Sequence, residues 1–244
     1  MDRKNWGFFS LERHVEMAYS HGVENCGEFH DGYMNFGLWE PGTKSYVEAA
    51  ENLIHRLGSL LGLNGSSRVL DVASGLGVQD IYLWRSFKPA LIDAMDVTWE
   101  HVLYGRKRAV QARCEEAISF HHGSAAALPF GEGTFTHVMS IDGAEHFDTR
   151  EKFFAEAFRV LKPGGVMALS DFALKRRPRP WLEKALFETG CRFWQVPRGN
   201  LQTLQAYREG LERCGFRNIA IQEMGASSIP GYYSEMRKPK AAVS

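Results

Sequence analysis

The chain has 244 residues, of which 44% are hydrophobic, 12% aromatic and 24% charged. This length fits one large domain with additions, and this composition excludes a many-domain assembly and an intrinsically disordered chain. The 29 basic residues balance the 29 acidic ones, so the zero net charge provides no long-range attraction to nucleic acid or to an anionic membrane.

The first strongly periodic segment is residues 45–63, where apolar side chains recur at spacings of three and four. This spacing predicts a helix with one buried face, which ends at Asn64-Gly65. The apolar run at residues 68–73 predicts a short strand that is buried on both faces. Further strands are predicted at residues 90–97, 118–121, 136–141, 166–170 and 216–222, and further helices at residues 100–117, 150–161 and 201–214.

This alternation of strands and helices predicts an α/β fold, doubly wound around a mostly parallel sheet. Two stretches lie outside the alternation. We interpret residues 1–44 as an N-terminal helical lid. Residues 45–244 form the main domain in this interpretation, with a cap inserted after the fifth strand at about residues 175–200.

The cysteines Cys26, Cys114, Cys191 and Cys214 lie far apart and form no Cys-x-x-Cys pair. This spacing argues against a zinc or redox site, so we expect reduced thiols and no metal ion. No apolar stretch reaches secretory or membrane-spanning length. We therefore expect a cytoplasmic protein without a membrane span, a monomer or homodimer that acts on a small molecule and not on nucleic acid.

A glycine-bearing turn follows the first predicted strand, from Asp71 to Gly77. In open α/β sheets the turn after the first strand binds the ligand. The small residues Ala73, Gly75 and Gly77 let backbone N–H groups approach a ligand closely, and the next helix begins with a partial positive charge. The turn therefore suits a carboxylate or a phosphate.

Two acidic residues narrow the choice of ligand. Asp96 ends the second predicted strand, about 20 residues past the glycines, where a carboxylate can bind ribose hydroxyls. Asp80 stands where a dinucleotide-binding motif has its third glycine. This acid disfavours a pyrophosphate, and with it a nicotinamide oxidoreductase, and favours a nucleoside that carries an amino acid.

The segment from Val69 to Gly77 resembles motif I of the class I S-adenosylmethionine-dependent methyltransferases. Asp96 resembles the ribose-binding acid of this family, and Gly123-Ser124-Ala125 resembles its adenine-facing loop. Residues 159–165 resemble the signature that precedes the fifth strand. The resemblance spans residues 69–172. Within this family, the chain is similar to the tocopherol methyltransferases and to the sugar or phenol O-methyltransferases.

The resemblance implies a Rossmann-like fold, with S-adenosylmethionine as the cofactor and S-adenosylhomocysteine as the product. The implied cofactor-binding residues are Asp71, Ala73, Ser74, Gly75, Gly77, Asp96, Val97, Ser124, Ala125, Ile141 and Tyr33. Two of them depart from the family pattern. Ala73 replaces a common glycine, which a negative φ would tolerate. Ser124 replaces a common aspartate, and its hydroxyl can accept a hydrogen bond from the adenine amino group without carrying charge.

Polar residues follow the fourth and fifth predicted strands, which would be neighbours in this fold. We expect His146 and Asp171 to meet over the transferred methyl group, with His146 as general base for O-methylation and Asp171 orienting it. Glu145 is a rival that would serve as base or cation stabiliser in carbon or nitrogen methylation.

Aromatic residues are concentrated in the two additions. Residues 30–39 resemble the segment that closes over the cofactor in small-molecule members of the family, and Tyr33 is expected to touch the methionine end. We expect an apolar acceptor pocket lined by Trp39, Phe172, Trp181 and Trp194. An alternative from another class is an accessory protein that binds S-adenosylmethionine without catalysis, because Ala73 and Ser124 depart from the family pattern.

Overall fold

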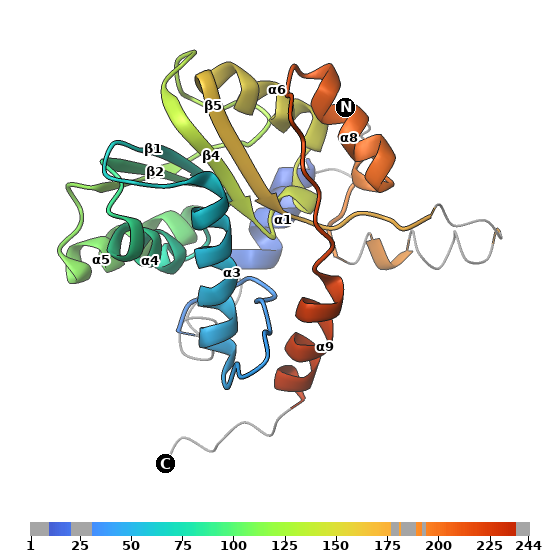
Figure 1. Ribbon diagram of the computed structural model, residues 1–244, viewed down its shortest axis with the longest axis horizontal. Helices are drawn as coiled ribbons and strands as arrows, with labels where there is room; N and C mark the ends of the chain where they lie inside the picture. The colour runs from blue at the N-terminus through green and yellow to red at the C-terminus, as the bar shows by residue number, and fades with distance from the viewer. Residues whose placement is uncertain (1–9, 21–30, 177–180, 182–188, 192–193, 238–244) are drawn as a thin grey trace.

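The computed structural model describes residues 10–20, 31–176, 181, 189–191 and 194–237. Within these residues a five-stranded parallel sheet has the order β3-β2-β1-β4-β5 (Figure 1). This confirms the predicted doubly wound α/β fold. The strands are β1 (Arg68–Val72), β2 (Leu91–Asp96), β3 (Ile118–His122), β4 (Phe135–Ile141) and β5 (Leu161–Ser170).

The order of the strands reverses between β1 and β4, because β2 and β3 extend the sheet on one side of β1 while β4 and β5 extend it on the other. At the carboxyl edge, Val72 pairs with Met95, and Ile141 pairs with Ser170. The segments that follow these strands therefore meet at one edge. In open α/β sheets this reversal is where a ligand binds.

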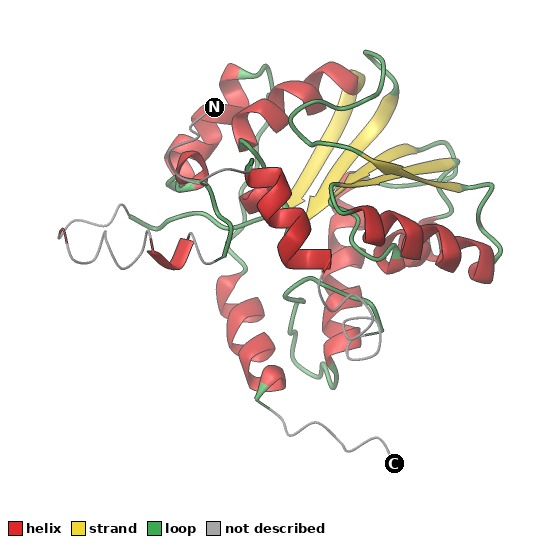
Figure 2. Ribbon diagram, turned by 180° about the vertical axis from the view of Figure 1, so that it is seen from behind, coloured by secondary structure: helices red, strands yellow, loops and turns green. Residues whose placement is uncertain are grey.

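Helices cover both faces of the sheet (Figures 1 and 2). Helices α3, α4 and α5 pack on one face, and α6 and α8 pack on the other. The longer helices are α1 (Leu11–Ser20), α3 (Tyr46–Leu61), α4 (Val78–Phe87), α5 (Trp99–Ala112), α6 (Arg150–Val160), α8 (Leu204–Arg213) and α9 (Gly225–Met236), and the 3₁₀ turns are η2 (Ala144–His146) and η3 (Arg198–Asn200).

Local sequence explains where these helices begin and end. The Ser45 side chain accepts a hydrogen bond from the backbone of Glu48 and caps α3, which ends at Gly62 with a φ of +67°. The Thr149 side chain caps α6 in the same way, by accepting from the backbone of Lys152. The predicted helix at 45–63 is thereby confirmed, and so are those at 100–117, 150–161 and 201–214, although each ends earlier than predicted.

The N-terminal and C-terminal additions lie at the ligand-binding side of the sheet. Helix α1 crosses the tips of the strands (Figure 2). Helix α9 holds the segment before α3, because the backbone N–H of Trp39 donates to Ser227 at 2.6 Å and the hydroxyl of Ser228 donates to the carbonyl of Gly37. None of the helices described is both long and apolar enough to cross a membrane.

One predicted strand is wrong. Residues 216–222 form an irregular, largely exposed segment that runs beside β5 in Figure 1 without joining the sheet. Its apolar residues do not all face inward, since Ile221 is 38% exposed. The predicted cap at 175–200 falls in large part on residues 177–180, 182–188 and 192–193, which lie outside the described residues, so the cap and the domain boundaries stay predictions.

Candidate active site

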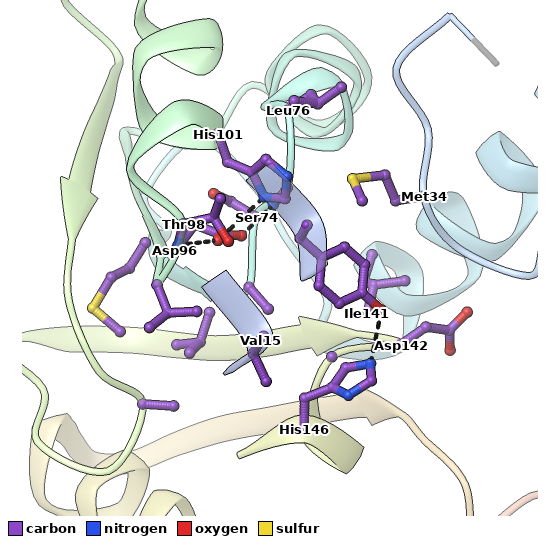
Figure 3. A pocket seen from close by; sticks show the side chains of 18 of the residues that line it. Val15, Met34, Ser74, Leu76, Asp96, Thr98, His101, Ile141, Asp142 and His146 are labelled. Atoms are coloured by element: carbon purple, nitrogen blue, oxygen red, sulfur yellow. Dashed lines mark hydrogen bonds and ion pairs between the residues drawn. The ribbon is translucent and has the colours of Figure 1, made fainter. Parts of the chain in front are cut away.

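A cavity of about 930 Å³, its open mouth included, lies at the carboxyl edge of the sheet. Its walls come from the segments that follow β1, β2, β3 and β4, from α1, and from residues 32–35 (Figure 3). This is the edge at which the sequence predicted a ligand. The predicted residues that line the cavity are Tyr33, Ala73, Ser74, Gly75, Asp96, Val97, Ala125, Ile141 and His146.

The turn after β1 forms the floor of the cavity. Gly75 and Gly77 have φ values of +55° and +76°, which favour glycine. A Cβ on Gly77 would lie 2.7 Å from the Phe120 ring and 2.8 Å from Gly105, so only glycine fits there. The hydroxyl of Ser74 is buried, and it has no hydrogen-bond partner among the described residues.

Ala73 is more constrained than the sequence suggested. Its φ is +68°, in the left-handed region, so the negative φ that would make alanine harmless is not adopted. The Ala73 Cβ also fills the space in which a side chain on Gly143 would stand, because a Cβ at Gly143 would lie 2.5 Å from it. The hydrogen bond from the Ala73 N–H to the carbonyl of Met95, 2.8 Å long, ties this strained residue to β2.

Asp96 is held rigidly at the cavity wall. One carboxylate oxygen accepts a hydrogen bond from the backbone of Gly75 at 2.9 Å, and the other accepts from the backbone of Thr98 at 2.8 Å. The ring of His101, which the sequence analysis missed, places its Nδ1 3.2 Å from the same carboxylate (Figure 3). The acid is only 6% exposed and is thus fixed between the glycine turn and α5.

Two fully buried carboxyl groups, Asp71 and Asp80, lie beneath the glycine turn. Burial raises the pKa of Asp71 to about 6, although a hydrogen bond from Gln79 opposes the shift. Burial, followed by the charge of Asp71, raises the pKa of Asp80 well above its ordinary value. Asp71 thus supports the turn from below and does not line the cavity among the residues described.

Ser124 and a residue of α1 meet beside the cavity. The Ser124 hydroxyl donates a hydrogen bond to Glu12, and it accepts one from the backbone of Ala126 at 3.1 Å. Glu12 lines the cavity, whereas Ser124 is not among the described residues of its wall. The sequence analysis missed Glu12, which lies 112 positions away from Ser124.

His146 lies in η2 and faces the cavity with a largely buried side chain. Its Nε2 lies 3.0 Å from the Tyr19 hydroxyl, which comes from α1 (Figure 3), and its Nδ1 lies 3.4 Å from the carbonyl of Gln195. Since a carbonyl can only accept, the proton sits on Nδ1 and Nε2 accepts from Tyr19. Burial lowers the pKa of His146 below 6.5, which favours the neutral imidazole.

Asp171 does not orient His146 as predicted. Its carboxylate accepts hydrogen bonds from the Arg150 guanidinium at 2.6 Å and from the Tyr207 hydroxyl at 2.9 Å. The Arg150 side chain is 1% exposed to solvent, so this buried cation takes the carboxylate as its counter-ion. The prediction was wrong because no local pattern indicated that Arg150, at the start of α6, points inward.

The turn that bears His146 is held by Asn200, another residue that sequence reasoning missed. The Asn200 side-chain amide donates to the carbonyls of Glu145 at 2.9 Å and of Phe147 at 2.8 Å, on either side of His146. Its amide oxygen accepts from the backbone of Arg150 at 3.0 Å. Asn200 is 2% exposed, so η3 and η2 are joined through a buried amide.

Glu145 and Asp142 complete the acidic surroundings of the site. Burial, then the charges of Asp171 and Asp142, raise the pKa of Glu145 well above its ordinary value, and the Glu145 side chain is 6% exposed. Asp142, which the sequence analysis did not select, lines the cavity and accepts hydrogen bonds from the backbone of Phe36 at 2.8 Å and from the Ser170 hydroxyl. Its φ of +49° shows that the turn after β4 is tightly constrained.

Among the described residues, the four aromatic side chains predicted to line an acceptor pocket are absent from the wall of this cavity. Trp181 and Trp194 are 80% and 59% exposed, and neither belongs to the described cavity wall. Phe172 packs against Phe36 with ring centroids 5.1 Å apart, and the Trp39 indole donates to the carbonyl of Phe36. An aromatic residue in the sequence predicts a buried or packed side chain, but it does not predict which way that side chain points. Tyr33 does line the cavity, and its hydroxyl donates to Glu51 at 2.8 Å.

These features fit a nucleoside that carries an amino acid. The glycine turn offers close backbone approach, the buried Ser74 hydroxyl offers a polar partner, and Asp96 offers a carboxylate for ribose hydroxyls. Within the described part of the chain, no three His, Cys, Asp or Glu side chains are grouped so as to hold a metal ion.

Comparison with known proteins points to one family. Residues 69–165 match the methyltransferase domain family. The chain is 34% identical to the erythromycin 3''-O-methyltransferase of Saccharopolyspora erythraea over 79% of its own length and 64% of that protein, so the match spans slightly less than two thirds of this relative. It is 28% identical to the 27-O-demethylrifamycin SV methyltransferase of Amycolatopsis mediterranei over 82% of this chain and 72% of the relative.

A solved structure has the same fold. The geranyl diphosphate C-methyltransferase of Streptomyces coelicolor, in complex with S-adenosyl-L-homocysteine, superposes with a TM-score of 0.76. The alignment covers 94% of this chain and 87% of that structure at 15% sequence identity. An identity this low shows a shared fold and nothing of the substrate.

Proposed function

We propose that the chain is a class I S-adenosylmethionine-dependent methyltransferase and that it transfers a methyl group to a hydroxyl oxygen of a small natural product. The names of the two relatives describe methylation of an erythromycin and of a demethylrifamycin, and the first names an oxygen acceptor. These names support the choice of a natural-product hydroxyl.

The cofactor of this family is S-adenosylmethionine, whose sulfonium supplies an electrophilic methyl group. In our proposal the turn at residues 73–76 holds its methionine end, and the Asp96 carboxylate accepts hydrogen bonds from its ribose hydroxyls. Tyr33 closes over the methionine end from the N-terminal segment. The remaining cavity residues exclude water from the reacting atoms.

The observation that carries the proposal is the hydrogen bond between the Tyr19 hydroxyl and His146 Nε2, 3.0 Å long. It places a hydroxyl group against the basic nitrogen of a neutral histidine, inside the cavity. An acceptor hydroxyl in the same position would donate its proton to Nε2. A positioned general base of this kind accelerates proton transfer by about 10² to 10⁴-fold.

The transfer is a displacement in which the acceptor oxygen forms a bond to the methyl carbon while the bond from that carbon to sulfur breaks. Bound S-adenosylmethionine would leave as the neutral thioether S-adenosylhomocysteine, and His146 Nε2 would take the hydroxyl proton. The carbonyl of Gln195 keeps the other ring proton on Nδ1, so that Nε2 is the basic atom. Asn200 holds the turn in which His146 lies.

Glu145 is less well suited than His146 to act as the general base. Its raised pKa favours the protonated acid at neutral pH, and a protonated carboxyl group cannot accept the acceptor's proton. Among the residues that the structure describes, Glu145 is also absent from the cavity wall. A carbon or nitrogen acceptor would require Glu145 to ionise first.

The test combines turnover with binding. Purified protein would be incubated with S-adenosylmethionine and a panel of macrocyclic natural products with free hydroxyls, including 27-O-demethylrifamycin SV, and mass spectrometry would detect the added methyl group. The His146→Ala variant should lose turnover by about 10² to 10⁴-fold. Its affinity for S-adenosylhomocysteine, measured by calorimetry, should stay within about twofold, since truncation removes no cofactor-binding carboxylate.

Three outcomes would overturn parts of this proposal. If the variant keeps full turnover, His146 is not the base. If the wild-type protein binds the cofactor but methylates no acceptor in the panel, the chain is better explained as an accessory binding protein. If methyl appears on carbon or nitrogen, the assignment of the acceptor atom is wrong.

A further inference from the structure

We infer that Glu12, on helix α1, supplies the carboxylate that accepts a hydrogen bond from the 6-amino group of the cofactor's adenine. The inference rests on the proposed function, because it assigns one more residue to the same cofactor. It gives the lid a role in recognising the base, in addition to covering the cavity.

The first step is the position of the base along the sheet edge. The strands run in the order β3-β2-β1-β4, the glycine turn follows β1, and Asp96 ends β2. A nucleoside whose ribose is held at Asp96 and whose amino acid lies at the turn must place its base further along, over the end of β3. The loop there begins at Gly123, whose N–H donates to the carbonyl of Asp96 at 3.0 Å.

The second step is that this loop carries no acid of its own. Its residues are Gly123, Ser124, Ala125 and Ala126. The one hydroxyl proton of Ser124 is donated to Glu12, and the Ser124 oxygen also accepts from Ala126. Adenine's amino group is a donor, so it requires an acceptor, and the negatively charged acceptor in contact with this loop is Glu12.

Two other carboxylates toward this side of the sheet, those of Glu156 and Asp93, are already engaged. Glu156 bonds the Arg159 guanidinium and accepts from the backbone of Leu128, and Asp93 lies 2.7 Å from the ring of His121. Glu12, by contrast, has no cation within ion-pair distance among the described residues and lines the cavity. A half-buried carboxylate of this kind gains most from a donor on the ligand.

The third step is the geometry of α1. Glu12, Val15 and Tyr19 all line the cavity, and their spacing of three and four residues places them on one face of the helix. Glu12 reaches the loop after β3, while Tyr19 reaches His146 after β4. Their separation of seven positions spans about 10 Å of helix axis. One helix thus contacts the cavity at the base end and at the reacting end.

A plain structural role for Glu12 makes a different prediction. If the contact with Ser124 only holds α1 closed, loss of Glu12 weakens every ligand equally, whatever its base. If Glu12 binds the amino group, the loss is specific for ligands that have that group. The test therefore compares S-adenosylhomocysteine with its 6-desamino analogue, in which hydrogen replaces the amino group.

Calorimetry would measure both ligands against the wild type, Glu12→Met and the double variant Glu12→Met/Ser124→Asp. Methionine keeps an unbranched side chain with good helix propensity but has no carboxylate. Glu16→Met is the matched control, because Glu16 lies one turn further along α1, pairs with Arg13 and lies outside the described cavity wall.

The wild type should prefer the amino ligand by roughly tenfold, which corresponds to one hydrogen bond to a charged group. Glu12→Met should lose this preference, Glu16→Met should keep it, and Ser124→Asp should restore it in the double variant by placing a carboxylate on the loop. A wild-type protein that binds both ligands equally, or a Glu12→Met variant that keeps the preference, would overturn the inference. If the wild type binds neither ligand, the proposed cofactor itself is wrong.

Discussion

Replacing Asn200 with alanine should separate the positioning of His146 from the binding of the cofactor. The substitution removes the amide that donates to the carbonyls of Glu145 and Phe147 and that accepts from the backbone of Arg150. None of these atoms lies in a solvent-exposed region, since Asn200 is 2% exposed. The turn that carries His146 then loses its main support.

The size of the effect follows from these three hydrogen bonds. At about 0.5–1.5 kcal/mol each, their loss should lower the free energy of unfolding by about 1.5–4.5 kcal/mol. A domain of this kind has about 5–15 kcal/mol of stability, so the variant should still fold. A less rigid turn misplaces Nε2 and should reduce kcat by about tenfold to hundredfold, part of the full contribution of a general base.

The assay would measure kcat, KM and the cofactor Kd, together with the unfolding midpoint in urea. The cofactor Kd should change little, since Asn200 does not line the described cavity wall. The acid limb of the pH profile should move toward pH 6.5, because a looser turn admits water and relieves the burial that lowers the pKa of His146.

Asn64→Ala is the matched control for this experiment. The Asn64 side chain also makes several hydrogen bonds, to the backbone of Gly62 and Ser66 and to the Ser66 hydroxyl, but it precedes β1 at the opposite edge of the sheet. It should lower stability without changing kcat or the pH profile. If Asn200→Ala behaves in the same way, Asn200 supports the fold alone and the reasoning fails.

Two further predictions concern pH. Because burial lowers the pKa of His146 below 6.5 and the neutral ring is the base, kcat/KM should fall as pH falls through a value below 6.5; a limb above 6.5 in the rate profile would contradict this. Because the folded-state pKa of Asp71 is raised from 3.8 to about 6, the folded protein holds this proton more tightly than the unfolded chain, and up to about 3 kcal/mol of stability should be lost as pH rises from 4 through 6. The pKa of Asp80 is itself raised by burial, so Asp80→Asn removes one of the two buried acids whose ionisation opposes folding, and urea unfolding at pH 5 and pH 8 should show a smaller loss in the variant than in the wild type.

The strands of the sheet were predictable because each is a short apolar run between turn residues. Val69, Leu70 and Val72 are all at most 1% exposed, as a parallel strand covered on both faces requires. Residues 216–222 have a comparable apolar content, yet they stay outside the sheet. Whether such a run joins the sheet depends on its contacts with β5, and these long-range contacts cannot be inferred from the local sequence.

The site was predictable only where it depends on the ends of strands. Asp96, Ile141 and His146 reach the cavity because the carboxyl ends of parallel strands share one edge. Glu12 and Tyr19 were missed because they come from a helix whose placement no strand dictates. The spacing of Leu11, Val15 and Tyr19 along one helix face was the available signal, and it predicts an inward face without saying which site it meets.

The partners of His146 explain why the expected pairing with Asp171 would have served the proposed reaction less well. A carboxylate against Nδ1 raises the pKa of an imidazole, and would therefore protonate more of the base near neutral pH. The Gln195 carbonyl selects the same tautomer with a smaller effect on the pKa, while burial keeps the ring neutral. Asp171 instead neutralises the buried Arg150, whose charge would otherwise stand unpaired close to the base. A hydroxyl that loses its proton only as the carbon–oxygen bond forms needs a neutral, well-placed acceptor more than a strong one, and the arrangement around His146 meets that requirement.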